Sequence, residues 1–344
     1  MAYSQLLNRW NTVLDFFSPS QKDIYFTEEY VKLYETDKEK AVCFVYNEGN
    51  YYLLFPYLLR MFQIDSENYY DFETPYGYGG PIINTRNREF IERALSSFYK
   101  YACCNGYVAG FIRFHPLLEN AEYCTSLGQI VSDRYTVSID LRPDIESVWM
   151  NEIHTKNRNI IKKGLKSGLR FIADYRYDYL NEFIALYNQT MNKLNADNFY
   201  YFPNSYYIQL QTTILNGFLG VTLYDDKVIA AAIFFYSEKI GHYHLSGNDK
   251  SMLKLYPNNF MLWEAAKELK IKGVDSFHLG GGTDSDEHNS LFEFKRKFSK
   301  SVYQFKIGKI IFNQMIYNKL CVKWERDNPD KKFMYQHYLL KYKY

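Results

Sequence analysis

The sequence predicts a mixed α/β fold, with helices packed on mixed sheets, that is divided into two domains. Runs of aromatic and β-branched residues alternate with amphipathic helical segments along the whole chain, which is typical of α/β and α+β proteins. The length of 344 residues exceeds the ~250–300 residues to which a single hydrophobic core grows. Charge is also divided, since residues 1–150 carry a net −7 and residues 151–344 a net +9. We place the domain boundary at residue 145, which gives domains 1–145 and 146–344.

The first half begins with a predicted helix and a predicted hairpin. Thr27 is a suitable N-cap for a helix over Phe26–Tyr34, because acidic residues occupy the first turn. Two aromatic runs, residues 41–46 and 51–59, flank Asn47-Glu48-Gly49-Asn50, which favours a β-hairpin. The remaining elements predicted in this half are a loop over Thr74–Ile83, a helix over Arg88–Cys104, and strands over Gly110–His115 and Tyr135–Leu141.

In the second half, three helices precede the order β-β-β-α-β. The three helices are predicted over Ile145–Lys166, Leu180–Asn195 and Tyr206–Asn216. Two strands are predicted next, over residues 218–224 and 228–236, and they form a hairpin. A third strand is predicted over His242–Ser246, a helix over Asn259–Lys272, and a last strand over Val274–Leu279. The helix has one apolar face and ends at Gly273. We expect the first half to have a similar outline.

Composition indicates a globular protein of a reducing compartment. The longest apolar run, Val228–Tyr236, is far shorter than the ~20 residues of a membrane helix. The N-terminal residues lack the basic and long apolar regions of a signal peptide. The five cysteines have no metal-type spacing, and Cys103 and Cys104 are adjacent, which suits neither a disulfide framework nor zinc. We therefore expect a cytoplasmic protein with reduced cysteines and no transmembrane segment.

A glycine triplet near the end of the second half is the strongest indication of chemistry. In the segment Ser276–Phe298, a short strand ends on Gly280, Gly281 and Gly282, and a basic segment with Lys295 and Arg296 follows. Glycines leave backbone N–H groups open to an anionic or carbonyl ligand. Cations placed just after such a loop can stabilise the charge that develops in acyl or phosphoryl transfer. The pattern favours a transferase.

A basic stripe lies on the helix predicted around residue 160. Arg158, Lys162 and Lys166 follow one another at i, i+4 spacing, and like charges at that spacing repel. Either the dipole at the C-terminal end of the helix or an anionic ligand such as a phosphate backbone can compensate for the repulsion. The basic charge of the second half has the same two interpretations, an anionic partner or drift of surface charge between domains.

Two further patterns have both a structural and a functional interpretation. Tyr76, Tyr78 and Gly79 belong to YGYGG, which is either a tight turn packed by tyrosines or a loop that binds a polar substrate. His242 and His244 alternate on one predicted strand, but the sequence indicates no third ligand, so we expect no metal site. P-loop, dinucleotide-binding and Gly-x-Ser-x-Gly patterns are absent from the sequence.

Several segments together resemble one family. They are TPYGYGGPI, HTKNRNIIKKGLKSGL, LYNQTMNKLNADNFYYF, YHLSGND and FHLGGG followed by SLFEFKRKF. This order is similar to that of the Fem-type acyltransferases, the aminoacyltransferases of peptidoglycan bridges and their relatives in the GNAT superfamily. The resemblance covers nearly the whole chain. It implies two tandem GNAT-like domains, with residues 317–344 returning to the first domain.

The resemblance also implies roles for individual residues. Lys295 matches the family's lysine that stabilises a tetrahedral oxyanion. Lys193 and Tyr201 match a basic and tyrosine pair that contacts the acceptor, and Tyr243 or His244 matches another acceptor-contacting aromatic residue. The long coiled-coil insertion that grips tRNA in some members is absent here. The activity implied is transfer of an acyl group, in the best-known members an amino acid from aminoacyl-tRNA, to an amine of a cell-wall precursor.

These observations lead to one expected function and two alternatives. The first is an acyltransferase that forms an amide on a small-molecule or lipid-linked cell-envelope precursor, with Arg158, Lys162, Lys166 and Arg296 at an anionic donor. The donor is aminoacyl-tRNA or acyl-CoA, although KLYPNNF (residues 254–260) lacks the glycines of a CoA-binding turn. The alternatives are an acyl-CoA-dependent N- or O-acyltransferase of a saccharide or lipid-linked sugar, and a GNAT-like scaffold that binds without catalysis.

Overall fold

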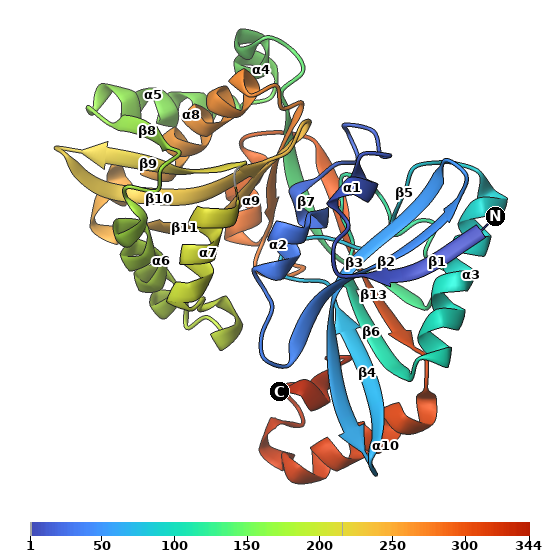
Figure 1. Ribbon diagram of the computed structural model, residues 1–344. Helices are drawn as coiled ribbons and strands as arrows, with labels where there is room; N and C mark the ends of the chain where they lie inside the picture. Colours follow the sequence, from blue (N-terminus) through green and yellow to red (C-terminus); the bar gives the residue numbers. More distant parts are fainter. Residues whose placement is uncertain (1, 215) are drawn as a thin grey trace. The chain divides into compact units, whose positions relative to one another are not determined.

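The chain folds into two compact units of mixed sheet and helices. The structure, a computed structural model, describes residues 2–214 and 216–344 (Figure 1). Unit 1 comprises Met1–Gln21, Tyr25–Asp133 and Phe305–Tyr344, and unit 2 comprises Lys22–Ile24 and Arg134–Gln304. These bounds differ from the predicted division at residue 145, because two strands, β7 (Gln129–Asp140) and β13 (Val302–Ile311), each contribute residues to both units.

The sheet of unit 1 is an antiparallel meander extended by one parallel strand. Its strands are β1 (Ala2–Leu7), β2 (Glu39–Glu48), β3 (Tyr51–Ile64), β4 (Glu67–Glu73) and β6 (Tyr107–Arg113), with the short β5 (Ile82–Ile83) beside β3. β1 to β4 pair antiparallel in order, β6 is parallel to β4, and the end of β13 is antiparallel to β6. The predicted hairpin is confirmed, since β2 and β3 are joined by Gly49 and Asn50, with Gly49 at φ 58°.

Helices cover both faces of this sheet. Helix α3 (Arg88–Cys104) has the predicted bounds and packs Phe90 and Phe98 on one face (Figure 1). The other face is covered by α1 (Asn11–Leu14), η1 (Ile24–Phe26) and α2 (Glu28–Lys32), where Thr27 is the N-cap, as predicted. The remaining elements of unit 1 are α10 (Gln314–Asp327), η4 (Pro329–Lys331) and η5 (Lys341–Lys343).

Unit 2 repeats the same topology. Its strands are β8 (Arg170–Asp174), β9 (Gly217–Tyr224), β10 (Lys227–Tyr236), β11 (Ile240–Asn248) and β12 (Ser276–Gly281). β8 to β11 are antiparallel, β12 is parallel to β11, and β7 is antiparallel to β12. Helix α8 (Pro257–Ile271) connects β11 to β12, as α3 precedes β6 in unit 1. The predicted order β-β-β-α-β, with a similar outline in the first half, is therefore confirmed.

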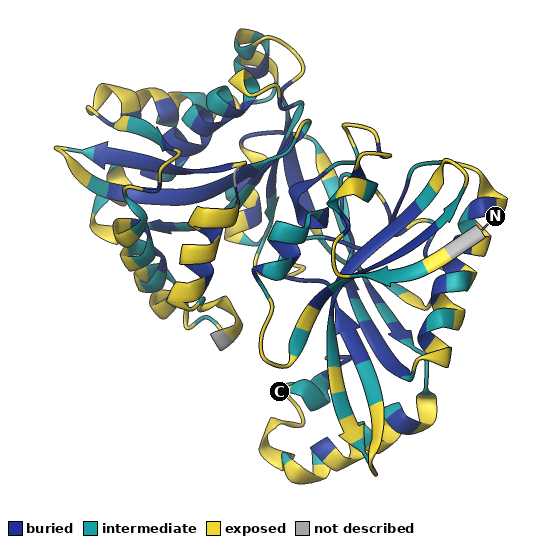
Figure 2. Ribbon diagram, in the orientation of Figure 1, coloured by how far each residue is buried: buried dark blue, intermediate teal, exposed yellow. Residues whose placement is uncertain are grey.

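The helices of unit 2 form two layers around its sheet. Helices α5 (Thr155–Lys166) and α8 lie on one face, and α6 (Leu180–Leu194) and α7 (Asn204–Thr213) lie on the other (Figure 1). Shorter elements are α4 (Ile145–Asn151), η2 (Asn198–Tyr200), η3 (Lys250–Leu255) and α9 (Ser290–Arg296). Buried residues concentrate on the strands and on the helix faces that pack against them (Figure 2).

One predicted helix is wrong in extent, because the segment 145–166 forms two helices. Helix α4 ends at Asn151, and α5 begins after His154, whose Nδ1 accepts a hydrogen bond from the backbone N–H of Lys156. Arg158 crosses the break and donates to the carbonyls of Met150 and Ile153, at 2.9 and 2.7 Å. Carbonyls at the end of α4 are thus bonded by a side chain, which permits the break.

Candidate active site

Lys295 is a buried cation at the end of a short helix. Asn289 is the N-cap of helix α9, and its Oδ1 accepts hydrogen bonds from two backbone N–H groups of the first turn. Phe292, one turn before Lys295, packs in the hydrophobic core of unit 2, so Lys295 faces inward as well. Only 7% of Lys295 is exposed. Its Nζ donates to the carbonyl of Gly281 at 2.7 Å and lies 5.8 Å from the ring centre of Tyr243.

The surroundings of Lys295 shift its protonation towards neutrality. Burial, and then the positive charge of Arg134, lower the pKa of Lys295 from its ordinary value of 10.5 to about 7. At pH 7 both the ammonium and the neutral amine are therefore present in comparable amounts. A lysine of this kind can donate a proton or a hydrogen bond to an oxyanion, and it can also accept a proton.

The glycine triplet allows close packing and directs carbonyls at cations. Gly280 has a φ of 74° at a bulge in the pairing of β12 with β7. A Cβ on Gly281 would lie 2.6 Å from the carbonyl oxygen of Tyr135, and one on Gly282 would lie 2.6 Å from Asn289 Oδ1. The Gly282 carbonyl accepts a hydrogen bond from Arg134 Nη1 at 3.0 Å, just as the Gly281 carbonyl accepts one from Lys295. Glycine is required here because backbone and side chains approach where a Cβ would stand.

Two neighbouring strands separate beside Lys295. β11 and β12 pair only where Ile240–His242 lie against Ser276–His278. Beyond that point β11 continues along β10, and the glycine end of β12 continues along β7. Tyr243 is the first residue of β11 after the separation, and burial raises the pKa of its hydroxyl to about 12. Of the two residues matched to an acceptor contact, Tyr243 faces Lys295, while His244 points to the opposite face of the strand.

The two histidines of β11 have separate partners. Nε2 of His242 lies 2.7 Å from Oδ2 of Asp23, and both residues are 1% exposed. Nε2 of His244 lies 2.9 Å from the hydroxyl of Tyr206. Burial, and then the neighbouring His242, lower the pKa of His244 to about 3, so it is neutral at physiological pH. The sequence offered no signal for Asp23, because it lies 219 residues from its partner.

The predicted acceptor pair lies on the surface of unit 2, at the end of α6. Lys193 is in the last turn of that helix and is exposed. Tyr201 is 36% exposed, and its hydroxyl donates to Asn192 Oδ1 at 2.7 Å. Asn195, with a φ of 46°, reverses the chain between them. The fold thus brings Lys193 and Tyr201 to the same end of α6.

The YGYGG loop belongs to unit 1 and is packed by aromatic rings. The carbonyl of Tyr76 accepts a hydrogen bond from the hydroxyl of Tyr30 at 2.6 Å. The ring of Tyr78 lies 5.5 Å from that of Tyr25 and 5.4 Å from that of Phe305. Asn120 Nδ2 donates to the carbonyl of Gly79 at 2.8 Å. These contacts agree with the tight-turn interpretation, and Tyr76 and Tyr78 are both half-buried.

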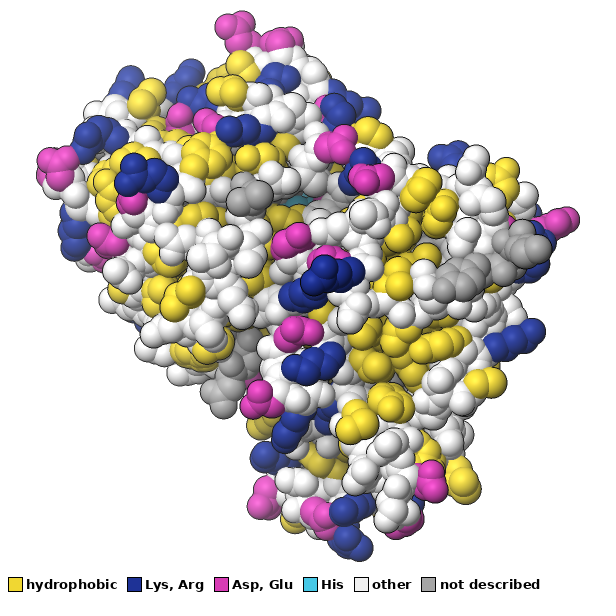
Figure 3. Space-filling view, in the orientation of Figure 1, with side chains coloured by type: hydrophobic (Ala, Val, Ile, Leu, Met, Phe, Trp, Pro, Cys, Tyr) yellow, Lys and Arg dark blue, Asp and Glu magenta, His cyan; other side chains and the backbone are white. Residues whose placement is uncertain are grey.

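The basic stripe of α5 is divided between a structural and an exposed part. Arg158 is bonded to the carbonyls at the end of α4, so its guanidinium serves the fold. Lys162 and Lys166 are exposed, and Lys166 lies in the last turn, where the helix dipole favours a cation. Arg296 is also exposed, 3.9 Å from Glu293. On the face of the molecule drawn in Figure 3, basic and acidic side chains are interspersed among the described residues.

Comparison of the sequence with protein-family models gives a match, which lies in the second half of the chain. Residues 155–296 match the sequence model of a family described as an acetyltransferase (GNAT) domain. No curated protein sequence matches the chain. Among the described residues, no helix combines the length and apolar character needed to cross a bilayer.

Three solved structures share the fold at low sequence identity. The crystal structure of FemX aligns with a TM-score of 0.72 at 13% identity, covering 92% of this chain and 99% of FemX. The C-terminal domain of a protein from Agrobacterium fabrum described as a lysylphosphatidylglycerol synthetase aligns with a TM-score of 0.55 at 16% identity, covering 86% of this chain and 89% of that domain. A conserved protein of Bacteroides thetaiotaomicron aligns with a TM-score of 0.50 at 12% identity, covering 75% of this chain and 86% of that protein. The resemblance to Fem-type, GNAT-like acyltransferases is thus confirmed at the level of the fold.

Proposed function

We propose that this protein is an acyltransferase that joins an activated acyl or aminoacyl group to an amine of a cell-envelope precursor. The observation that carries the proposal is the buried Lys295, held by the Gly281 carbonyl where β11 and β12 separate. The match of residues 155–296 to a GNAT acetyltransferase domain supports acyl transfer. The fold shared with a lysylphosphatidylglycerol synthetase domain supports an amino acid as the acyl group and the envelope as the destination.

The chemistry requires stabilisation of one developing negative charge. The acceptor nitrogen attacks the acyl carbon, the carbonyl oxygen becomes an oxyanion, and the carbon–oxygen or carbon–sulfur bond to the donor then breaks. The proton lost by the amine leaves with the donor oxygen or sulfur, directly or through water. In our proposal the Lys295 ammonium binds the oxyanion, and N–H groups around Gly280–Gly282 position the acyl carbonyl. A cation acts strongly there because the site is buried.

The proposal assigns substrate contacts within each unit by itself. In unit 2, Tyr243, Lys193 and Tyr201 contact the acceptor, with His244 supporting the strand from its other face. In unit 1, Tyr76, Tyr78 and Gly79 form a loop that binds a polar substrate group. Lys162, Lys166 and Arg296 attract the anionic donor, whereas Arg158 shapes the helix that carries the two lysines.

The start of α8 favours aminoacyl-tRNA over acyl-CoA. In GNAT domains that use CoA, a glycine-rich turn before this helix presents N–H groups to the pyrophosphate. Here Tyr256, at a φ of 57°, precedes the helix, and Pro257 occupies its first turn without an N–H group. Two residues further on, Asn259 is buried, and its side-chain Nδ2 donates to Asn157 Oδ1 at 2.7 Å. Pro257 therefore leaves one backbone N–H group fewer for a pyrophosphate.

Donor binding tests this choice directly. The purified protein is titrated with bulk aminoacyl-tRNA and, separately, with acetyl-CoA at several salt concentrations. We expect micromolar tRNA binding, and we expect Lys162→Ala with Lys166→Ala to make the slope of log K against log salt less negative by about 1.5. Lys38→Ala with Lys100→Ala, two exposed lysines of unit 1, is the matched control. Saturable CoA binding without tRNA binding would instead support the saccharide acyltransferase, and binding of neither would support the scaffold.

The pH dependence of transfer tests the protonation state of Lys295. Its pKa of about 7 means that the ammonium is lost as pH rises through 7. The reactive neutral form of the acceptor amine increases as pH rises, while the Lys295 ammonium decreases. We therefore compare the ratio of kcat/KM of wild type to that of Lys295→Arg, because the titration of the acceptor affects both enzymes equally. Arginine stays charged, so we expect the ratio to fall about tenfold per pH unit above 7. A ratio that rises with pH would instead identify neutral Lys295 as a base.

A further inference from the structure

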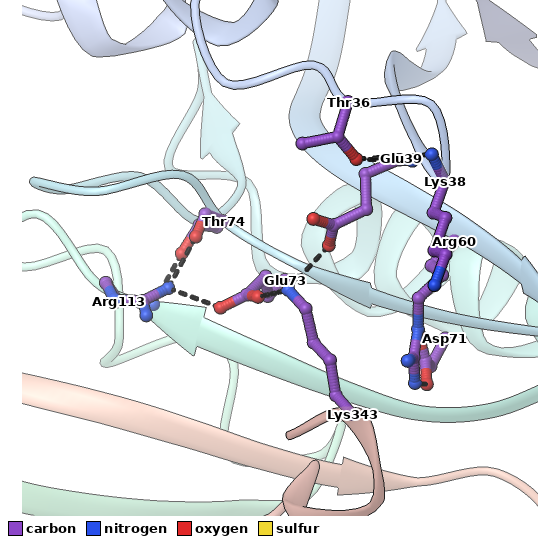
Figure 4. Close-up of polar contacts among 9 residues, drawn as sticks. All are labelled: Thr36, Lys38, Glu39, Arg60, Asp71, Glu73, Thr74, Arg113 and Lys343. Carbon is purple, nitrogen blue, oxygen red and sulfur yellow. Dashed lines mark hydrogen bonds and ion pairs between the residues drawn. The ribbon is translucent and has the colours of Figure 1, made fainter. Parts of the chain in front are cut away.

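A row of buried charges connects η5 with the base of the YGYGG loop in unit 1 (Figure 4). Lys343 Nζ donates to Glu39 Oε1 at 2.6 Å and also pairs with Glu73 Oε1. The other carboxylate oxygen of Glu73, Oε2, accepts a hydrogen bond from Arg113 Nη1 at 3.0 Å. All four side chains are 18% exposed or less. Two positive and two negative side chains therefore balance one another where little solvent reaches them.

Arg113 continues this row to the loop. The same Nη1 that binds Glu73 also donates to the carbonyl of Thr74 at 2.5 Å. The backbone N–H of Arg113 donates to Thr74 Oγ1 at 2.8 Å, and the N–H of Thr74 donates to the Phe111 carbonyl at 3.0 Å. A Cβ on Gly79 would lie 3.0 Å from Thr74 Cγ2, so Thr74 packs against the far end of the loop. Arg113 thus holds the residue on which the loop rests.

The charges of the row depend on one another. Burial by itself raises the pKa of Glu73, but the positive charges of Arg113 and Lys343 outweigh burial, and the pKa lies below its ordinary value. For Lys343, burial by itself lowers the pKa, and the charges of Glu73 and Glu39 raise it above the ordinary value. Without the Lys343 charge, Arg113 would remain as the cation that pairs with the buried Glu73 carboxylate. Arg113 would then be drawn from the Thr74 carbonyl towards Glu73.

We propose that Lys343 is a positioning residue for the YGYGG loop, acting through Glu73 and Arg113 on Thr74. The proposal rests on the function proposed above, in which Tyr76, Tyr78 and Gly79 bind a polar substrate group. Lys343 would therefore tune substrate binding from a distant part of the chain, 270 residues from Glu73. It touches no substrate itself.

The chain contains a matched control on the same short helix. Lys341 is also largely buried, but its Nζ pairs with Glu325 of α10 and so ties η5 to α10 rather than to the loop. If Lys343 acts only by docking η5, then Lys341→Met and Lys343→Met should have the same consequences. If Lys343 positions the loop, only Lys343→Met should affect residues 76–80.

Hydrogen exchange of the full-length protein measures the loop without any substrate. We expect the amides of residues 76–80 to exchange about tenfold faster in Lys343→Met, the scale of one lost charge-assisted hydrogen bond. Lys341→Met should leave them unchanged, and Lys343→Arg should restore wild-type exchange. Equal acceleration in both methionine variants, or no acceleration in Lys343→Met, would overturn the proposal.

Steady-state kinetics then measure the consequence for the acceptor. With a lysine-containing peptidoglycan precursor peptide as acceptor, we expect Lys343→Met to raise KM about tenfold and to change kcat by less than about twofold. Lys341→Met should change neither constant, and Lys343→Arg should recover the wild-type KM. Faster loop exchange with an unchanged KM would overturn the role in substrate binding. If the wild type transfers nothing, the proposed function fails, while the exchange result still decides whether Lys343 holds the loop.

Discussion

Replacing Lys295 by methionine is expected to slow acyl transfer by about 100-fold or more while the protein stays folded. One buried group that stabilises an oxyanion contributes about 10²–10³ in rate, because it acts on charge that appears only in the transition state. Methionine retains most of the volume of the side chain and removes its charge. Burial already disfavours the ammonium, as its lowered pKa indicates, so its removal should not destabilise unit 2. Single-turnover transfer from a saturating donor measures the chemical step directly.

The control for this experiment is two residues away. Lys297 carries the same charge in the same basic segment but is exposed. Its carbonyl, which accepts hydrogen bonds from the backbone N–H of His154 and from Asn157 Nδ2, is unaffected by a side-chain substitution. Lys297→Met should therefore transfer at the wild-type rate. A wild-type rate in Lys295→Met would show that Lys295 has no part in the mechanism. Equal losses of rate in Lys295→Met and Lys297→Met would indicate that the total positive charge of the segment matters, and not Lys295 in particular.

Replacing Gly247 by alanine is expected to destabilise unit 2 by about 3 kcal/mol. A Cβ on Gly247 would lie 2.4 Å from the carbonyl carbon of Leu186 and 2.4 Å from the backbone nitrogen of Tyr187. These are backbone atoms of α6, so no side-chain rotation can relieve the overlap. Either α6 must move away from β11 or the strand must bend. Both movements open the layer in which His242 is buried and His244 is half-buried.

Chemical denaturation followed by far-ultraviolet circular dichroism measures this change. The midpoint should fall in Gly247→Ala, and one transition should shift more than the other if the two units unfold separately. Asn248→Ala, the next residue on β11, removes atoms instead of adding them and should have a smaller effect. A midpoint unchanged from wild type in Gly247→Ala would mean that α6 and β11 are not held together as tightly as their contact indicates.

Several elements could be predicted from the sequence because their signals are local. The β2–β3 and β9–β10 hairpins are indicated by turn residues between two strand-like runs, and α3 by the spacing of its apolar residues. β4 was missed because its acidic residues interrupt an apolar pattern. Two of them, Asp71 and Glu73, are buried in ion pairs with Arg60 and Arg113, which lie on other strands. A pattern based on hydrophobicity cannot recognise a charged residue that is buried with its partner.

The residues of the candidate site also differ in how much of their role a local sequence pattern indicates. Lys295 and the glycine triplet could be chosen as candidates from the sequence, because 14 residues separate Lys295 from Gly281 and one motif contains both. Arg134 lies 148 residues from Gly282, and nothing in its own surroundings in the sequence marks it. Arg158 was predicted to meet a donor, yet it bonds the end of α4, because the break in the predicted helix creates acceptors for it.

By itself, the sequence determined the local elements, the order β-β-β-α-β and the motif that carries Lys295. Tertiary structure decided the units to which β7 and β13 contribute, the pairing of Asp23 with His242, and the lowered pKa of Lys295. The physical reason is that helices and turns depend on interactions among near neighbours in the chain. Burial and electrostatic pairing depend instead on which distant segments the fold brings together, and no local pattern encodes that.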